Sequence, residues 1–369
     1  MGGDDGEAYP RDSSFGKRAG WVLEVMHTLR GVGWNWSCVP RRLRAPVTSR
    51  SKWILTRLLR GAAIWLWLDF LVFYVRTLDR NFFVPEGHAT GFSPPADGVP
   101  YPSLFSISTK PLLSYPPPLG FPPMPPTPSW KRTAYQLLLH VLRTVLGASA
   151  MFTTISGMYT FVALVFVLLG CVLGTSAGWR ARWLSPNAWP DAFGHILGGD
   201  YGHGVRGYWG RGWHSLFRSI FTAPGDGLVA RLSLPPHSLA AKIIALTLPF
   251  VFSGALHFAG CWTQSLGGWG AVQFFLLQPL GIVLESYCCC FRPRPRGAVA
   301  KVLMYLWALA WFAATATPFF EDYRWGGLWV VEPIPVSVIR WRADLWMSQP
   351  GERGWGRWAD GGGYGVVLG

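Results

Sequence analysis

Charged residues are scarce in this chain of 369 residues: Asp, Glu, Lys and Arg together make up 14% of it, against about 25% in soluble globular domains. Half of the residues are hydrophobic, and the chain holds 22 Trp and 23 Phe. This composition excludes an ordinary soluble domain and indicates a membrane protein. The length suits several membrane spans better than a single span attached to a large soluble domain.

Several other classes of protein find no support in the sequence. The six cysteines form no CxxC pair, so no zinc site is indicated. The spacing of His195, His203, Asp191 and Asp200 is too weak a pattern to predict a metal. Phosphate-binding loops and nucleophilic Ser or Cys motifs are absent. The net charge of +14 comes from basic residues beside apolar runs, as in membrane loops, so no nucleic acid is expected as a partner.

Long apolar runs predict the membrane spans, and the basic residues between them predict the topology. We expect spans near residues 61–76, 150–173, 243–262, 270–286 and 302–320. In this arrangement the basic loops at 40–60, 178–240 and 291–301 fall on one side of the membrane. The positive-inside rule makes that side cytoplasmic. His214 then faces the cytosol, and His257 lies within the membrane layer.

The remaining segments set the expected domain boundaries. Residues 1–20 are expected to be disordered, residues 21–345 to form one membrane domain that opens with a short helix at 21–29, and residues 346–369 to be a flexible tail. A Pro-rich stretch at 80–130 cannot form a regular helix. It is either an exposed linker, which the composition favours, or an ordered lid.

Two ionisable side chains interrupt apolar stretches. Asp69 is a functional candidate because acids are rare inside membrane spans, but a helix–helix hydrogen bond or an interfacial position explains it better. His140 lies off the apolar face of its predicted helix and is interpreted as interfacial rather than catalytic.

A basic, aromatic segment, RGYWGRGWHSLFR, runs from Arg206 to Arg218. If it is helical, Arg211, His214 and Arg218 share one face, and the guanidinium groups suit phosphate or carboxylate because they bind both in a bidentate manner. The alternative is an amphipathic helix whose basic residues meet lipid headgroups. The aromatic residues that can anchor the segment at the membrane interface are Trp209 and Trp213.

A second histidine, His257, lies in the apolar stretch VFSGALHFAG. Burial requires it to be neutral and hydrogen-bonded, and a neutral imidazole is also suited to act as a general base near pH 7. The small residues Ser253, Gly254 and Ala255 would leave room for a substrate beside it. The alternative is a histidine that only packs between helices.

These motifs resemble a known family. RGYWGRGWHSLFR looks like the FWGRRWHQxFR signature of the wax synthase-like branch of the membrane-bound O-acyltransferases, and VFSGALHFAG looks like the SGxxH motif of that branch. Gln273 to Glu285, QFFLLQPLGIVLE, resembles the span that follows. Arg30 to Trp36, RGVGWNW, resembles the RGxGW box typical of fungal members. The four motifs come in the family's order and cover roughly residues 30–340.

The resemblance implies an all-α fold, a polytopic membrane helix bundle that encloses an intramembrane reaction chamber. It implies that His257 is catalytic and that His214 takes the place of the Asn or His paired with the catalytic residue. The implied donor is an acyl-CoA that enters from the cytosol, and the acceptor is a hydrophobic alcohol in the lipid bilayer. No bound cofactor is implied, and the location would be the endoplasmic reticulum. The residues expected to contact CoA or substrate are Arg211, Arg218, Trp209 and Trp213.

Within that family the expected reaction is acetyl transfer from acetyl-CoA to a terpenoid or meroterpenoid hydroxyl, because fungal members with the RGxGW box are often such acetyltransferases. The alternatives are wax ester synthesis from a long-chain donor and a truncated, non-catalytic membrane paralogue, since only 29 residues precede the box. Some relatives carry Glu after the SGxxH histidine where this chain has Phe258. The resemblance therefore supplies no carboxylate partner for His257.

Overall fold

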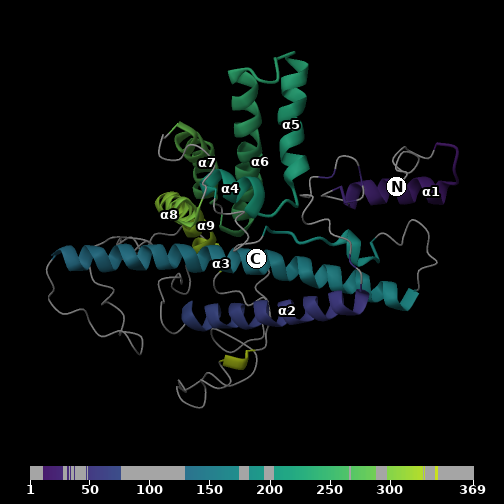
Figure 1. Ribbon diagram of the computed structural model, residues 1–369, viewed down its shortest axis with the longest axis horizontal. Coiled ribbons are helices and arrows are strands. Elements are labelled where there is room, and N and C mark those ends of the chain that lie inside the picture. The colour runs from purple at the N-terminus through teal and green to yellow at the C-terminus, as the bar shows by residue number, and fades with distance from the viewer. Residues whose placement is uncertain are drawn as a thin grey trace. The chain divides into compact units, whose positions relative to one another are not determined.

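Helices make up all of the regular secondary structure in the part of the chain that the computed structural model describes (Figure 1). The described residues are 11–27, 31, 32, 34, 37, 47, 49–75, 129–173, 183–194, 203–265, 267–287, 297–326, 328 and 337–339. The predicted all-α membrane fold is confirmed. The helices are α1 (Phe15–His27), α2 (Arg50–Phe73), α3 (Ser129–Leu173), the 3₁₀ turn η6 (Pro186–Ala188), α4 (Gly204–Gly207), the π-helical turn η7 (Tyr208–Gly212), α5 (Arg218–Arg231), α6 (Leu239–Ser265), α7 (Trp269–Tyr287), α8 (Ala298–Thr315) and α9 (Thr317–Trp325).

Among the described residues, three helical segments are long and apolar enough to cross a membrane, judged by length and composition. They are Thr133–Leu173, Leu239–Gln264 and Ala298–Thr315, and they contain most of three of the five predicted spans. The predicted spans near 61–76 and 270–286 also form helices, α2 and α7, but these do not meet the same criterion among the described residues.

Two helix boundaries differ from the expected ones. The span predicted at 302–320 breaks at Ala316, because Pro318 has no N–H to continue α8 and instead opens the first turn of α9. At the other end of the chain, α1 begins at Phe15, within the stretch expected to be disordered. The domain boundaries as a whole stay a prediction, and most of the Pro-rich stretch at 80–130 lies outside the described residues.

The chain divides into two compact units whose boundaries fall inside helices. Unit one contains residues 1–61, 156–252 and 279–308, and unit two contains 62–155, 253–278 and 309–369.

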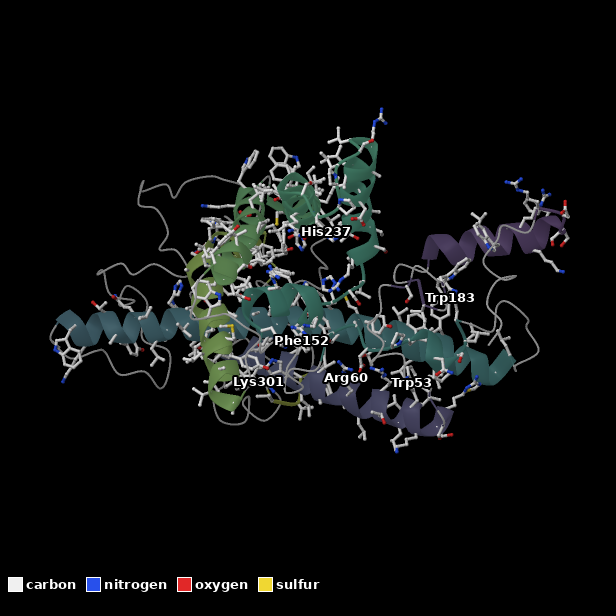
Figure 2. All side chains as sticks on the ribbon, turned by 45° about the horizontal axis from the view of Figure 1, so that its top comes forward. Trp53, Arg60, Phe152, Trp183, His237 and Lys301 are labelled. Atoms are coloured by element: carbon white, nitrogen blue, oxygen red, sulfur yellow. The ribbon has the colours of Figure 1, made fainter. Side chains whose placement is uncertain are left out.

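In unit one, the first turns of α2 pack against the last turns of α3. Trp53 is buried against Ala163 and Val167, and Figure 2 labels Trp53 on α2. Arg50 donates from Nη1 to the carbonyl oxygen of Gly170 at 3.4 Å. A cation is favourable there because the carbonyl groups of the last helical turn carry partial negative charge.

Unit one also contains a helical hairpin made of α5 and the first part of α6 (Figure 1). Gly225 of α5 faces α6: a Cβ atom at this position would lie 3.7 Å from the carbonyl oxygen of Ile244 and 3.8 Å from Leu248 Cβ. The two helices are thus in van der Waals contact at Gly225.

In unit two, α9 holds the start of α7. The Asp322 carboxylate accepts a hydrogen bond from the backbone N–H of Ala271 at 2.7 Å, so an acid of one helix caps the first turn of another. Gly268 turns the chain between α6 and α7 with a φ of +125°, and a Cβ there would lie 2.8 Å from the carbonyl oxygen of Phe258. Only glycine fits that turn without strain.

The histidine of α3 is also explained by packing in unit two. His140 Nε2 bonds the carbonyl oxygen of Ala313 in α8 at 2.6 Å. This contact gives His140 a role in joining α3 to α8.

Asp69 joins α2 to a distant segment near the end of the described chain. Its Oδ2 accepts hydrogen bonds from the backbone N–H groups of Val338 at 2.9 Å and Ile339 at 3.0 Å. Asp69 and the neighbouring Ser337 are both buried. The carboxylate therefore caps a helical turn, which accounts for an acid in an apolar helix without a role in chemistry.

We expect Asp69→Ala to lower the free energy of unfolding by about 1–2 kcal/mol, the usual loss for a missing cap, because two backbone N–H groups lose their acceptor. Thermal unfolding of the purified protein in detergent measures the change. Asp226→Asn is the matched control, since Asp226 is exposed on α5. An equal effect of the two substitutions would contradict the capping role.

Candidate active site

The ring of His257 is oriented by its own helix. Nδ1 lies 2.7 Å from the carbonyl oxygen of Ser253, one turn earlier in α6. A carbonyl oxygen can only accept a hydrogen bond, so Nδ1 carries the proton in the neutral ring and Nε2 carries the lone pair. This tautomer is the one that a general base acting through Nε2 requires.

Aromatic rings from two other helices of unit two surround His257. The Phe275 ring of α7 has its centroid 4.6 Å from the imidazole centroid, and the Phe319 ring of α9 has its centroid at 5.7 Å. The histidine is therefore half-buried in an apolar setting.

The small residues before His257 do not all leave open space. A Cβ at Gly254 would lie 3.5 Å from Phe275 Cβ and from Val272 Cα. Gly254 therefore faces α7 at ordinary van der Waals distance, and room for a substrate beside His257 stays a prediction. Ala255, the next residue, is exposed.

The segment from Arg206 to Arg218 is not one helix, contrary to the sequence expectation. It forms α4, then the π-helical turn η7 that ends at Gly212, and then an extended residue, Trp213, with φ −65° and ψ 157°. Helix resumes only at Arg218. The helical periodicity fails because backbone hydrogen bonds to residues 192–194 replace the helical ones: Gly194 N–H donates to the carbonyl oxygen of Gly212 at 2.9 Å.

The arginines of this segment consequently do not share a helical face. Arg211 is exposed in η7. Arg218 opens α5, and its Nη2 donates to the carbonyl oxygen of Trp209 at 3.2 Å. Contact of Arg211 and Arg218 with CoA stays a prediction.

His214 lies among aromatic rings of unit one, whereas His257 belongs to unit two. The His214 ring centroid is 5.6 Å from Phe193, 5.2 Å from Trp213 and 6.0 Å from Phe217. The ring is half-buried, and these aromatic neighbours restrict how it can turn.

The two tryptophans of the motif also pack within unit one. Trp213 stacks on Tyr208 with centroids 5.4 Å apart and planes at 21°. Trp209 meets Phe250 of α6 edge-on at 5.5 Å. These contacts fix the motif against α6, and a direct role of Trp209 or Trp213 toward substrate stays a prediction.

Glu285 is a further residue of the site, and the sequence analysis did not assign it a role. Its Oε2 accepts from the backbone N–H groups of Val205 at 2.8 Å and Arg206 at 3.5 Å, and from Trp307 Nε1 at 3.2 Å. The last turn of α7 therefore caps the first turn of α4, which contains Arg206, the first residue of the histidine motif. The signal in the sequence was a single acid at the end of an apolar run, which is a functional candidate by default.

Asp191 anchors the segment that pairs with the motif. Its Oδ1 receives hydrogen bonds from Arg57 Nη1 at 2.5 Å and Arg60 Nη1 at 2.6 Å, both on α2. Burial raises the pKa of Asp191, but the two guanidinium charges and their hydrogen bonds outweigh it and hold the pKa below its usual value. Asp191 was one of the four residues whose spacing was considered for a metal site, and in the structure it forms an ion pair with two arginines.

Gly204 is required by the Glu285 contact. Its φ is +69°, and a Cβ there would collide with the Glu285 carboxylate. We expect Gly204→Ala to lower the free energy of unfolding by about 1–3 kcal/mol, measured by thermal unfolding. Gly210→Ala is the matched control, because a Cβ at Gly210 meets no atom within 4 Å. An equal loss of stability in both variants would contradict the role of the Glu285 contact, because it would show that the motif tolerates no added methyl group at either position.

The stabilising effect of Asp191 should depend on pH. Because the pKa of Asp191 is lower in the native state, the stability that its carboxylate contributes is complete above the unfolded pKa of about 3.9. It is lost as pH falls through the native pKa. At neutral pH, Asp191→Asn should reduce the free energy of unfolding by about 1.5–3 kcal/mol. Melting curves of the unmodified protein and of Asp191→Asn between about pH 3 and pH 7 measure the difference in stability between them. This difference should become smaller as the pH falls. A difference independent of pH would contradict the ion-pair account.

Comparison with known proteins bears on what this arrangement does. The sequence profile of the membrane bound O-acyl transferase family matches residues 189–277, a stretch that contains Asp191, His214 and His257. No solved structure matches.

Three curated fungal proteins illustrate the similarity. Acetyltransferase ataH of Aspergillus terreus is 28% identical over 86% of this chain and 94% of its own length. Acetyltransferase ple2 of Rhodocybe pseudopiperita is 26% identical and O-Mevalon transferase macI of Penicillium terrestre is 24% identical, each over 80% of this chain. The chain spans 64% of the length of ple2 and 60% of that of macI.

These matches confirm the resemblance to the membrane-bound O-acyltransferases and to fungal acetyltransferases, and with it the prediction that this membrane protein is an acyltransferase enzyme.

Proposed function

We propose that the protein transfers an acyl group, in the first place acetyl from acetyl-CoA, to a hydroxyl of a terpenoid or meroterpenoid alcohol. The observation that carries the proposal is the His257 tautomer, because the Nδ1 contact with Ser253 leaves the Nε2 lone pair to act as a base. The protein would be multi-pass, in the endoplasmic reticulum membrane. The three apolar helices among the described residues and the basic loops support insertion in a membrane, and the endoplasmic reticulum rests on the family resemblance alone.

In the proposed reaction, Nε2 of His257 takes the proton of the acceptor hydroxyl as its oxygen attacks the carbonyl carbon of the acyl-CoA thioester. The new C–O bond forms, the C–S bond breaks, and the CoA thiolate takes the proton back from His257. His214 would donate a hydrogen bond to the thioester oxygen, where negative charge develops. Arg211 and Arg218 would bind the CoA phosphates.

The acyl group is the least constrained part of the proposal. Two of the compared relatives are named acetyltransferases, and a third is named an O-Mevalon transferase. Acetyl is therefore the first choice, long-chain transfer to a fatty alcohol is the alternative, and a non-catalytic paralogue is the third reading.

The decisive variant is His257→Gln, which keeps a polar side chain of similar size but removes the base. Loss of a general base should lower kcat by about 100- to 10,000-fold, while the amount of folded protein stays the same. Membranes from a heterologous host, given labelled acetyl-CoA or a labelled long-chain acyl-CoA with terpenoid and fatty alcohols, measure ester formation. His237→Gln is the matched control, since His237 is exposed between α5 and α6.

The donor that gives ester separates the alternatives. Ester from acetyl-CoA and a polycyclic alcohol, lost in His257→Gln and kept in His237→Gln, supports the proposal. Ester from the long-chain donor alone moves the assignment to wax synthesis. Turnover by His257→Gln near that of the unmodified protein would remove His257 from the mechanism.

A further inference from the structure

His214 is held by a short non-helical segment, residues 192–194, rather than by a helix of its own. Ser215 N–H donates to the carbonyl oxygen of Ala192 at 3.3 Å, and Gly194 N–H donates to the carbonyl oxygen of Gly212 at 2.9 Å. The two bonds lie on either side of His214 in the sequence. They therefore bracket its backbone and fix the direction in which the side chain leaves it.

The same segment also contacts the His214 ring. Phe193, which is 2% exposed, meets the imidazole edge-on with centroids 5.6 Å apart and the Trp213 ring at 5.3 Å. A displacement of residues 192–194 would move both the backbone of His214 and one wall of its ring environment.

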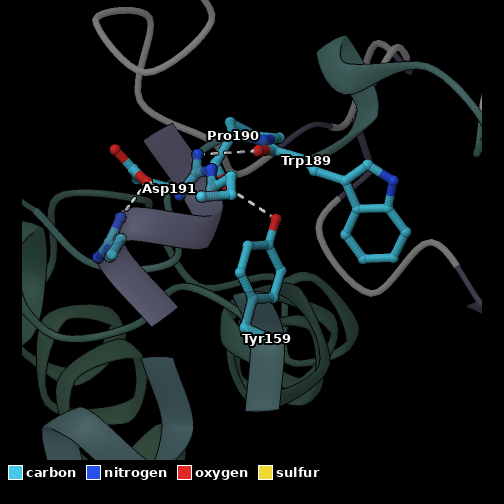
Figure 3. Close-up of polar contacts among 6 residues, drawn as sticks. Tyr159, Trp189, Pro190 and Asp191 are labelled. Carbon is cyan, nitrogen blue, oxygen red and sulfur yellow. Dashed lines mark hydrogen bonds and ion pairs between the residues drawn. The ribbon is translucent and has the colours of Figure 1, made fainter. Parts of the chain in front are cut away.

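The segment is itself fixed at its beginning, by side chains of α2 and α3 (Figure 3). Tyr159 Oη donates to the carbonyl oxygen of Pro190 at 2.7 Å, and Arg57 Nη2 donates to that of Trp189 at 3.4 Å. The charged contact is the one at Asp191, whose Oδ1 binds Arg57 and Arg60 together. Asp191 immediately precedes Ala192, the first residue bonded to the motif.

We propose that Asp191 is a positioning residue for His214: its carboxylate, clamped by Arg57 and Arg60, sets the place of residues 192–194 and through them the position of the imidazole. The inference rests on the proposed function only where it concerns turnover. The link between Asp191 and His214 is a property of unit one and holds whatever reaction the protein performs.

Labelling of histidine by diethylpyrocarbonate tests that link directly. In the full-length protein in detergent, with modification quantified for each histidine by peptide mass spectrometry, Asp191→Asn should raise the labelling rate of His214 several-fold. The rates at His257, in the other unit, and at His237, which is exposed, should stay the same. An unchanged rate at His214 overturns the proposal, and so does an equal rise at His214 and His257, because that would be general loosening.

Kinetics then tests the consequence for the proposed reaction. Asp191→Asn should lower kcat by about 10- to 100-fold, as expected for a misplaced catalytic group, with little change in the KM for the acyl donor. Asp226→Asn removes an exposed carboxylate from α5 and should leave kcat unchanged. An unchanged kcat in Asp191→Asn, although His214 labelling rises and the parent protein is active, would exclude an effect on turnover.

Arg60 offers a milder pair of variants that keeps the test valid if Asp191→Asn folds poorly. Arg60 reaches Asp191 through Nη1, so Arg60→Lys preserves a cation at this place, whereas Arg60→Gln does not. Arg60→Gln should raise His214 labelling, and Arg60→Lys should restore the original rate. Equal His214 labelling rates in the two variants would contradict the proposal that the charge of Arg60 holds Asp191 in place. If the parent protein forms no ester, the labelling results still decide the proposal, while the proposed function fails alone.

Discussion

Carboxylates that bind backbone N–H groups at the starts of helical segments hold the described parts of this protein together. A charge in an apolar setting is costly unless it is hydrogen-bonded, and the first N–H groups of a helix have no partner within the helix. A hydrogen bond from such an N–H group to a carboxylate gives both groups a partner. Glu285 binds the start of α4, Asp322 the start of α7 and Asp69 the turn at 338–339. Each contact joins segments that are far apart in the sequence, so the few acids of the chain connect its elements.

The two histidines depend on this framework to different degrees. His257 is oriented by a carbonyl oxygen one turn away in its own helix, so its tautomer is set as soon as α6 forms. His214 lies outside regular helix, and its position is set by residues 192–194, which in turn rest on the Asp191 ion pair with α2. Substitutions far from the chemistry should therefore affect His214 much more readily than His257.

Structural features that depend on the local residue pattern could be predicted from the sequence. Features that depend on partners far away along the chain could not. Apolar runs predicted three segments that are long and apolar enough to cross a membrane, and both motif histidines lie within the stretch that the family profile matches. The helix expected at 206–218 failed because bonds to residues 192–194 outcompete helical periodicity there. The backbone partners of Glu285 lie about 80 positions away, and the arginines that bind Asp191 lie more than 130 positions away. Spacing along a chain contains no information on such pairs, although an isolated acid in an apolar run signals that one exists.

The partner of His257 also limits how it can act as a base. Nδ1 bonds a carbonyl oxygen of the backbone, and the next residue is Phe258, which carries no charge. A carbonyl dipole orients the ring but supplies no full negative charge to balance an imidazolium among the rings of Phe275 and Phe319. A separated imidazolium is thus unfavourable. Proton removal at His257 should coincide with attack on the thioester, so that the developing oxyanion supplies the balancing charge.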